Sequence, residues 1–486
     1  MVSSLNQNST ANGIKEDVVV VMVPFLLQGH LNQLLHISRL VSSYNVPIYY
    51  LCYSDKIKQV KCRVHGWDPL TTCNIHFHEF PNPPSRDQYY CSSNEMESQK
   101  FILPLLEESL MLRDPVGAFL QEVSRRTHRV VVIYDSLMTS VVHDAVVSIP
   151  NAEAYSFHAS SAFMISSMYL EEEIIRHHLP LFIGKFVAKL LLPSGVEFPN
   201  NLPSYQTSFI PEFMDYITMQ HFNSTVCSGN LYSTCKAVEG AYLNALARFH
   251  RLLRRGGKEW AIGPLHPIAT IDDDQNNVSR HKCLEWLDEQ EPNSVILVSF
   301  GTTTSLSTEQ IKELAIGLEK SQQKFIWILS DALLQVGEQV QIPKGYIERV
   351  EGRGVVVKDW APQLEILGHS STGGFLSHCG WNSVLESITM GVPLATWPMV
   401  FDHPRIAVLV TKVLNIGITV KDWEQRDELI TSTTIETALK KLMASPEGNE
   451  VRKNVVELGK KVRESVAVGG DSKRDLDSFI AHITRS

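Results

Sequence analysis

The sequence predicts an α/β protein of two domains, each built on a parallel sheet covered by helices. A chain of 486 residues is too long for one ordinary hydrophobic core. Continuous apolar runs alternate with helical patterns, which is typical of strands that are buried on both faces of a parallel sheet. This pattern occurs in each half of the chain, and a polar stretch from Gly263 to Arg280 separates the halves. Each sheet therefore belongs to its own domain.

In the first half, the β-branched run Val18–Val23 predicts a strand. Pro24 to Gly29 breaks the pattern, and apolar residues then recur at helical spacing from Leu34 to Val41. Val46–Cys52 predicts the next strand, and Val130–Tyr134 predicts a later one. The stretch from Phe182 to Asn244 mixes apolar segments with prolines, and we expect it to hold helices and a loop facing a ligand.

The polar residues that follow these strands mark the expected ligand side. Gly29 and His30 follow the first predicted strand, and Asp135 ends a later one. Ligands of open parallel sheets bind beyond the carboxyl ends of the strands. We therefore expect His30 and Asp135 to face the same site.

The second half repeats the arrangement. Val295–Phe300 predicts a strand, Gly301–Ser307 a loop, and the stripe from Ile311 to Leu318 a helix. Further strands are predicted at Phe325–Leu329, Val355–Lys358, Gly374–Leu376 and Pro393–Trp397. Near the end, a helical face from Val451 to Val466 precedes Gly469-Gly470-Asp471, for which we predict a helix stop and a new N-cap at Asp471.

Composition limits the class of protein. The formal net charge is −9 without a long basic run, which argues against nucleic-acid binding. The eight cysteines show no metal-ligand spacing, so we expect reduced thiols and a cytoplasmic protein. Residues 1–16 lack the pattern of a signal peptide and are expected to form a disordered tail. The apolar run Val18–Leu27 is too short for a membrane span.

Four blocks between residues 360 and 403 carry most of the functional information. They are Trp360–His369, Gly373–Ser387, Gly391–Pro393 and Asp402-His403. Together they resemble the signature of plant secondary-product glycosyltransferases along its whole length. The resemblance extends to Pro24–His30, Val298–Thr302 and the overall length. The segments most similar to zeatin O-glycosyltransferases are Gln28–Gln33, Ile75–His78 and Arg129–Leu137.

The pattern around Trp381 also has a direct physical interpretation. Gly374–Ser377 predicts a strand, His378–Gly380 a turn, and Trp381–Met390 a helix that Gly391 closes. The free N–H groups and the dipole of such a helix N-terminus favour an anion. His378, Asn382 and Ser383 could add hydrogen bonds to a pyrophosphate. Taken singly, Asn382 or Ser383 is more typical of an ordinary helix cap, and Trp381 is more typical of a core aromatic. The interpretation as a pyrophosphate site therefore depends on the whole signature.

The resemblance implies a site for a UDP-sugar. It places Glu386 on the ribose hydroxyls with Gln363 nearby, and Trp360 offers a flat surface for the uracil ring. It places Thr304 near the phosphates, and the carboxylate of Asp402 can accept hydrogen bonds from sugar hydroxyls. The remaining expected donor-site residues are Ala361, Trp381 and His403.

The expected catalytic pair is His30 and Asp135. A neutral imidazole can take a proton from an alcohol near neutral pH, because its unperturbed pKa is about 6.5. The resemblance makes His30 the general base and Asp135 the carboxylate that orients the imidazole and stabilises its protonated form. The implied reaction is transfer of a sugar to a hydroxyl group of a small molecule, with inversion of the anomeric centre.

The resemblance implies two facing Rossmann-like domains of the GT-B type with a cleft between them. We expect an acceptor-binding domain over residues 17–262, a linker over 263–280 and a UDP-sugar domain over 281–465. Residues 466–486 are expected to form a helix that packs back on the first domain. The partners are a UDP-sugar and a small hydroxyl acceptor, with no nucleic acid, no membrane span and a monomeric chain.

Several alternatives stay open. A nucleotide-dependent oxidoreductase fits the coarse α/β pattern, but no G-x-G-x-x-G follows the first strand. An inactive UDP-binding protein is the third class, and the presence of both His30 and Asp135 argues against it. Two features could suggest a metal site. The acidic run Asp272–Asp274 fits a solvated loop better, and the pair His76 and His78 lacks a nearby third ligand. We expect no metal.

The donor and the acceptor are not fixed by the signature. His403 replaces the glutamine that is usual at the end of the signature, so UDP-glucose, UDP-galactose and UDP-xylose all remain candidates. A zeatin-type cytokinin is the leading acceptor, and flavonoids, other phenolics and small alcohols are the alternatives.

Overall fold

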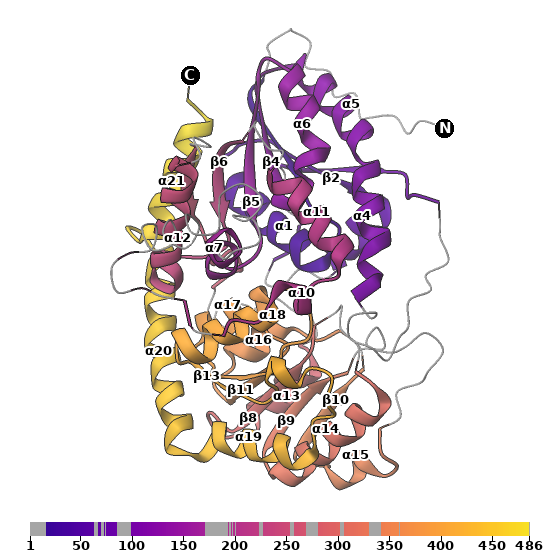
Figure 1. The fold of residues 1–486 in the computed structure, drawn as a ribbon, viewed down its shortest axis with the longest axis vertical. Coiled ribbons are helices and arrows are strands. Elements are labelled where there is room, and N and C mark those ends of the chain that lie inside the picture. The colour runs from indigo at the N-terminus through magenta and orange to yellow at the C-terminus, as the bar shows by residue number, and fades with distance from the viewer. Residues whose placement is uncertain are drawn as a thin grey trace.

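The fold consists of two α/β domains stacked along the long axis of the molecule (Figure 1). The computed structural model describes residues 16–62, 67–69, 72, 74–84, 99–170, 193, 196, 198–199, 201–222, 227–252, 257–268, 280–301, 306–329, 342–358 and 360–485. Most of the predicted 182–244 stretch before residue 201, and most of the predicted linker, lie outside these residues.

The first domain contains a seven-stranded sheet in the order β3-β2-β1-β4-β5-β6-β7. All its strand pairs are parallel. Its strands are β1 (Glu16–Val23), β2 (Ile48–Tyr53), β3 (Ile75–Phe80), β4 (Thr127–Asp135), β5 (Ala152–His158), β6 (Cys227–Tyr232) and β7 (Lys258–Ala261). Residues 19–23 of β1 and 130–135 of β4 are fully buried, as expected for central strands without an exposed face.

Helices cover both faces of this sheet. They are α1 (Gln28–Ser42), α2 (Ser54–Cys62), η1 (Gln99–Phe101), α4 (Ile102–Met111), α5 (Arg113–Ser124), η2 (Ser136–Met138), α6 (Thr139–Ser148), α7 (Ala162–Leu170), α10 (Tyr205–Ser208), α11 (Pro211–Phe222) and α12 (Lys236–Leu252). Helix α1 begins earlier than the sequence pattern predicts, because Leu27 already accepts backbone bonds from His30 and Leu31. His30 therefore lies in the first turn of a helix and not in a loop.

The second domain contains a six-stranded parallel sheet in the order β10-β9-β8-β11-β12-β13. Its strands are β8 (Val295–Ser299), β9 (Lys324–Ile328), β10 (Gly354–Val357), β11 (Thr372–Ser377), β12 (Leu394–Thr396) and β13 (Gly417–Thr419). Its helices are α13 (Lys282–Asp288), α14 (Thr308–Ser321), α15 (Tyr346–Arg349), α16 (Gln363–Gly368), α17 (Trp381–Met390), α18 (His403–Val408), η5 (Leu409–Val413), η6 (Trp423–Gln425), α19 (Ser432–Ala444) and α20 (Pro446–Val466).

The end of the chain returns to the first domain. Helix α20 runs along the second domain, and α21 (Asp471–Ile483) then lies beside the first sheet (Figure 1). Asp475 accepts hydrogen bonds from the amide of Ala261, at 3.1 Å, and from Lys236. The N-cap of α21 is Gly470, and Asp471 is the first helical residue, so the predicted cap is displaced by one position.

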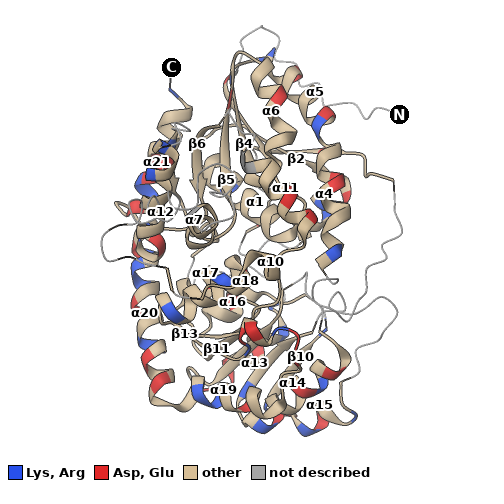
Figure 2. Ribbon diagram, in the orientation of Figure 1, with Lys and Arg blue, Asp and Glu red and all other residues tan. Residues whose placement is uncertain are grey.

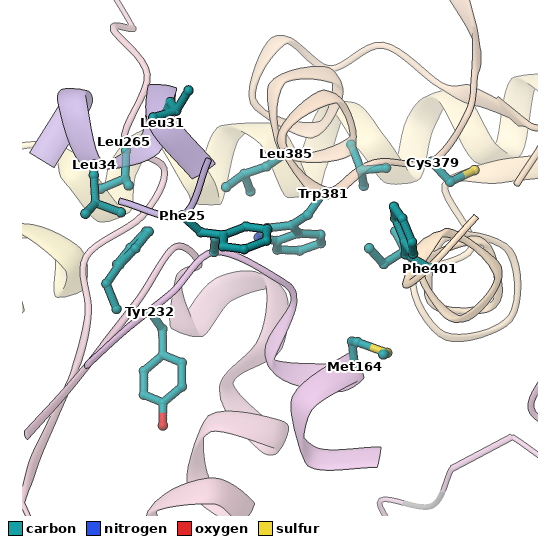
Figure 3. Packing of buried hydrophobic residues seen from close by; sticks show 14 of the residues in the cluster. Phe25, Leu31, Leu34, Met164, Tyr232, Leu265, Cys379, Trp381, Leu385 and Phe401 are labelled. Carbon is teal, nitrogen blue, oxygen red and sulfur yellow. The ribbon is translucent and has the colours of Figure 1, made fainter. Parts of the chain in front are cut away.

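Charged side chains lie mainly on the outer helices, and few lie where the two sheets face each other (Figure 2). Apolar packing continues across that junction instead. Figure 3 shows Phe25 and Tyr232 of the first domain in the same buried layer as Trp381 and Leu385 of α17. In the part of the chain that the structure describes, no helix is both long and apolar enough to cross a membrane.

Candidate functional site

The candidate site lies at the junction of the domains, where the carboxyl ends of four strands converge. In the first domain, β1 leads into α1 and β4 ends at Asp135. In the second, β11 leads into α17 and β12 leads to Asp402. Because β1 and β4 pair in parallel with Val23 opposite Tyr134, the residues that follow these two strands meet at one edge of the sheet.

His30 and Asp135 form a hydrogen-bonded pair. Nδ1 of His30 lies 2.7 Å from Oδ2 of Asp135, and the other carboxylate oxygen accepts from the amide of Leu137 at 3.0 Å. Asp135 is fully buried, whereas the His30 side chain is 24% exposed. The ring of Phe25 packs edge-on against the imidazole, with the ring centroids 5.3 Å apart. This geometry fixes the imidazole through Nδ1, while the side chain as a whole stays partly exposed.

Three effects determine the pKa of His30. Burial lowers the pKa, but the charge and the hydrogen bond of Asp135 raise it, and Asp402 of the second domain raises it further. The net effect is a pKa above the ordinary value for histidine. The pair therefore stabilises the protonated imidazole, which is what a general base needs after it has taken a proton.

Helix α17 presents an open N-terminus to this junction. Its N-cap is Gly380, so no side chain caps its first N–H groups. Gly391 closes the helix with φ of 73°, as the sequence predicts. A Cβ atom on Gly380 would lie 2.5 Å from Nε2 of His378, and one on Gly301 would lie 2.7 Å from the same atom. The His378 imidazole is thus packed between two glycines, and burial lowers its pKa to about 4.

Gln363, Ser383 and Glu386 form a polar cluster on the neighbouring face of α17. Nε2 of Gln363 donates to Oε2 of Glu386 at 2.8 Å and to Oγ of Ser383 at 2.9 Å. Burial raises the pKa of Glu386 to about 7, although the hydrogen bond from Gln363 opposes this effect. Trp360, three positions before Gln363 in the chain, has 45% of its surface exposed, and Ala361 is buried. A carboxylate and an exposed indole ring are therefore available in one region.

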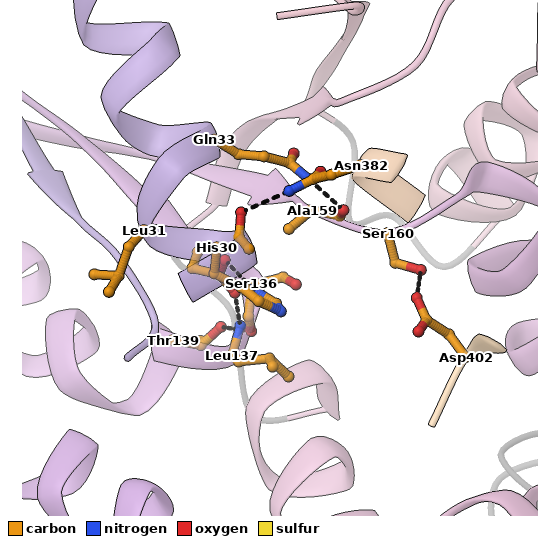
Figure 4. A network of polar contacts seen from close by, with 12 residues as sticks. His30, Leu31, Gln33, Ser136, Leu137, Thr139, Ala159, Ser160, Asn382 and Asp402 are labelled. Carbon is orange, nitrogen blue, oxygen red and sulfur yellow. Dashed lines mark hydrogen bonds and ion pairs between the residues drawn. The ribbon is translucent and has the colours of Figure 1, made fainter. Parts of the chain in front are cut away.

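Asp402 and His403 lie at the start of α18. Oδ2 of Asp402 accepts a 2.5 Å hydrogen bond from Oγ of Ser160 in the first domain (Figure 4). The ring of His403 is edge-on to that of His378 at 4.8 Å, and its Nδ1 accepts from the amide of Val400 at 3.2 Å. Burial lowers the pKa of His403 well below its ordinary value, and His378 adds to this effect. Burial therefore favours the neutral form of both imidazoles.

Two predicted donor-site residues have their side chains turned toward the first domain. Nε1 of Trp381 donates to the carbonyl of Ser233 at 2.8 Å, and the ring is buried. Nδ2 of Asn382 donates to the carbonyl of Gly29 at 3.0 Å, and its Oδ1 accepts from Gln33. Trp381 thus joins the two domains through its side chain.

Sequence reasoning did not single out Gln33 or Ser160, although both lie in the site. The signal available for Gln33 was its position between Leu31 and the apolar run that begins at Leu34. Thr304 and Asp272–Asp274 lie outside the described residues. His76 and His78 are on β3, and the described ranges contain no group of three or more His, Cys, Asp or Glu side chains that could hold a metal ion.

Two family models match the chain. The description "Glycosyltransferase, N-terminal domain" matches residues 16–267, and "UDP-glucoronosyl and UDP-glucosyl transferase" matches residues 214–463. The chain is 45% identical over 490 residues to zeatin O-glucosyltransferase of Phaseolus lunatus, covering 99% of this chain and all of that protein. It is 46% identical to zeatin O-xylosyltransferase of Phaseolus vulgaris, over 96% of this chain and 98% of that protein.

Solved structures share the fold. A UDP-glucosyltransferase of Polygonum tinctorium that glucosylates indoxyl superposes with a TM-score of 0.75 at 26% identity, over 97% of this chain and all of the other. A transferase from Siraitia grosvenorii, solved with UDP, has the same TM-score and identity over 96% of this chain and all of its own. These structural matches confirm the predicted GT-B fold. The family matches argue against the alternative that the chain is an oxidoreductase.

Proposed function

The chain belongs to the UDP-glycosyltransferase family, and on this premise we propose that it transfers a sugar from a UDP-sugar to a hydroxyl group of a zeatin-type cytokinin with inversion. The observation that carries the proposal is the 2.7 Å pair of His30 and Asp135 beside the uncapped N-terminus of α17, whose Asn382 donates to the carbonyl of Gly29. A base on one domain and an anion-binding helix end on the other are the two parts that such a transfer requires.

In the proposed reaction, Nε2 of His30 takes the proton of the acceptor hydroxyl. The oxygen forms a bond to the anomeric carbon from the face opposite UDP, and the bond between that carbon and the diphosphate oxygen breaks. An α-linked donor thus gives a β-glycoside and UDP. Asp135 stabilises the imidazolium that forms, and the buried carboxylate keeps the ring oriented throughout.

The proposed donor site follows α17. Trp360 stacks on the uracil ring, with Ala361 beside it, and Glu386 and Gln363 bind the ribose hydroxyls. The diphosphate lies at the helix N-terminus, where the dipole and the free N–H groups favour its charge. The residues proposed to contact it are Thr304, His378, Trp381, Asn382 and Ser383. Asp402 and His403 bind the sugar.

The donor sugar and the acceptor rest on different observations. The two relatives at 45% and 46% identity are named for glucosyl and xylosyl transfer, so identity alone does not choose the donor. His403 bears on the choice of donor sugar. Because Nδ1 of its ring already accepts a hydrogen bond from the amide of Val400, only Nε2 is left to bond a sugar hydroxyl. The zeatin acceptor is proposed from both relatives, which share that word in their names.

We also propose the division of labour between the domains. Residues 17–262 bind the acceptor, residues 281–465 bind the UDP-sugar, and residues 263–280 link them. The C-terminal segment 466–486 belongs structurally with the first domain, as the Asp475 contacts support. The chain is proposed to act as a monomer.

A crossed screen tests the proposal. The purified protein is incubated with UDP-glucose, UDP-xylose or UDP-galactose and with trans-zeatin, cis-zeatin, a flavonol or a simple phenol, and products are identified by mass spectrometry. The anomeric configuration of the product is read by NMR. The proposal expects a β-O-glycoside on the zeatin side chain. Products that form only with phenols would overturn the proposal that zeatin is the acceptor. UDP binding without any product would indicate an inactive binding protein.

A further inference from the structure

A network of buried amide groups joins α1 to α17 across the domain junction. Gln33 is 5% exposed, and its Nε2 donates to the carbonyl of Ala159 at 2.9 Å and to Oδ1 of Asn382. Nδ2 of Asn382 donates in turn to the carbonyl of Gly29 at 3.0 Å (Figure 4). The network therefore returns to the helix on which it starts.

The position of these groups links the two halves of the active site. Asn382 is the second residue of α17, the helix whose N-terminus faces the donor. Gly29 directly precedes His30, so the Asn382 amide is attached to the turn that carries the base. Besides the bonds from Trp381 to Ser233 and from Ser160 to Asp402, the Asn382 amide is thus the junction contact that lies next to the base, and Gln33 holds it from the other side.

The chemistry of a glutamine side chain fits this position. Two acceptor oxygens, of Ala159 and Asn382, face its NH₂ group, and a neutral amide provides two N–H donors on one nitrogen without adding a charge to this buried position. A hydrocarbon of the same length would leave both oxygens without this donor. Oε1 of Gln33 has no hydrogen-bond partner among the described residues, so the two donated bonds hold the side chain.

The turn that receives Gln33 also contacts the sugar end of the site. Ala159 is followed by Ser160, whose hydroxyl donates to Asp402. Glu239 fixes this turn, because its carboxylate accepts from Ser161 Oγ at 2.6 Å, from the amide of Ala162 at 3.0 Å and from that of Phe163 at 2.8 Å. Gln33 therefore connects α17 to a rigid part of the first domain.

We propose that Gln33 is a positioning residue for sugar transfer, which holds Asn382 against Gly29 and so sets the distance between the donor-binding helix and His30. The inference rests on the proposed roles of His30 and α17. Gln33 does not react. Its contribution is the alignment of the two reacting groups, for which small displacements have large effects on rate.

The test compares Gln33→Met and Gln33→Asn with Gln28→Met. Met keeps the length of the side chain without its hydrogen bonds, and Asn keeps one amide that is too short to reach both acceptors. Gln28 is a matched control, because it is also a buried glutamine of α1, but its partners Asn32 and Gln59 both lie in the first domain.

For Gln33→Met we expect kcat to fall roughly ten-fold to a hundred-fold, with the UDP Kd and both KM values changed less than about three-fold. The kcat of Gln33→Asn is expected to lie between those of Gln33→Met and the wild type. The kcat of Gln28→Met should stay within about two-fold of the wild-type value. Equal losses in the Gln33 and Gln28 variants would overturn the proposal. So would an unchanged kcat, or a loss that appears only in UDP affinity, since Gln33 would then act on donor binding and not on the alignment of the donor with His30.

Hydrogen–deuterium exchange gives a second measurement that needs no acceptor. In the wild type and in Gln28→Met, UDP is expected to protect both the start of α17 and residues 27–34. In Gln33→Met, the protection of α17 should persist while that of residues 27–34 is lost. Protection of both segments in Gln33→Met would overturn the inference even if no acceptor is ever found. A wild type that couples both segments but transfers no sugar would contradict the proposed function alone.

Discussion

Nδ1 of His30 lies 2.7 Å from Oδ2 of Asp135, although 105 positions separate the two residues in the chain. The contact exists because β1 and β4 are parallel neighbours at the centre of the first sheet, and both residues follow the same edge. One partner is fully buried and the other is partly open to the domain junction. The buried carboxylate and the accessible imidazole lead to the first two predictions.

Replacing His30 with alanine is expected to lower kcat by roughly 10²–10⁴-fold, because a positioned general base contributes an effect of that size. UDP binding should survive, since the base is on the first domain and the proposed nucleotide site is on the second. Turnover and calorimetric UDP titration of the same preparation check both points. A folded His30→Ala enzyme that keeps more than about a third of kcat would remove His30 from its proposed role.

The substitution Asp135→Asn is expected to change the pH profile as well as the rate. In the wild type, the raised pKa of His30 means that kcat/KM should fall as the pH drops through a value above the ordinary one. Without the Asp135 charge, burial dominates and the pKa of His30 falls, so the acidic limb should move to lower pH. The plateau should drop about a hundred-fold or more, because the imidazolium loses its counter-charge. An unchanged acidic limb and rate would contradict the assigned role.

Donor binding should weaken as the pH falls through neutrality. Burial raises the pKa of Glu386 to about 7, and the ribose hydroxyls would donate to its ionised form. Binding then favours the charged carboxylate, so the affinity for UDP-glucose should rise between about pH 6 and about pH 8. Calorimetric titrations over this range measure how the affinity for UDP-glucose depends on pH. Glu386→Gln serves as the control, because it should bind UDP-glucose more weakly and its affinity should no longer depend on pH. A slope that persists in the variant would assign the titration to another group.

Exchanging His403 for glutamine is expected to favour glucose. A glutamine side chain offers both an acceptor and an NH₂ donor on a flexible stem, whereas the neutral His403 ring has one nitrogen already occupied by Val400. One gained or mispaired hydrogen bond in a dry site is worth about 1–3 kcal/mol, or roughly ten-fold to a hundred-fold in kcat/KM. The ratios for UDP-glucose, UDP-galactose and UDP-xylose are compared in both proteins. If these ratios agree within about two-fold, His403 does not select the donor.

Activity is expected to persist in excess EDTA. The proposed stabilisation of the departing diphosphate comes from the N-terminus of α17 and its neighbouring side chains, and not from a divalent cation. Initial rates with and without chelator, on protein dialysed against it, provide the measurement. Loss of activity that Mg²⁺ or Mn²⁺ restores would direct attention back to Asp272–Asp274 and to His76 and His78.

Most of the secondary structure could be predicted because it follows from local patterns. The helix Trp381–Met390 and its closure at Gly391 were predicted to the residue, since a strand, a turn and a glycine at positive φ are all coded within a few positions. The first residues of helices were predicted less accurately than the helices themselves. Helix α1 begins at Gln28 because Leu27 accepts from two following amides, and no apolar periodicity marks that first turn.

The sequence by itself determined which chemical groups the protein has and at which strand ends they lie, because strand and helix periods are properties of short segments. Only the tertiary structure decided that Asn382 meets Gly29 and Gln33, and that Asp402 meets Ser160. These partners are hundreds of positions apart, and their contact depends on how two separate sheets pack against each other. No local pattern contains that information, since the side chains at the junction are specified by their neighbours in space and not in sequence.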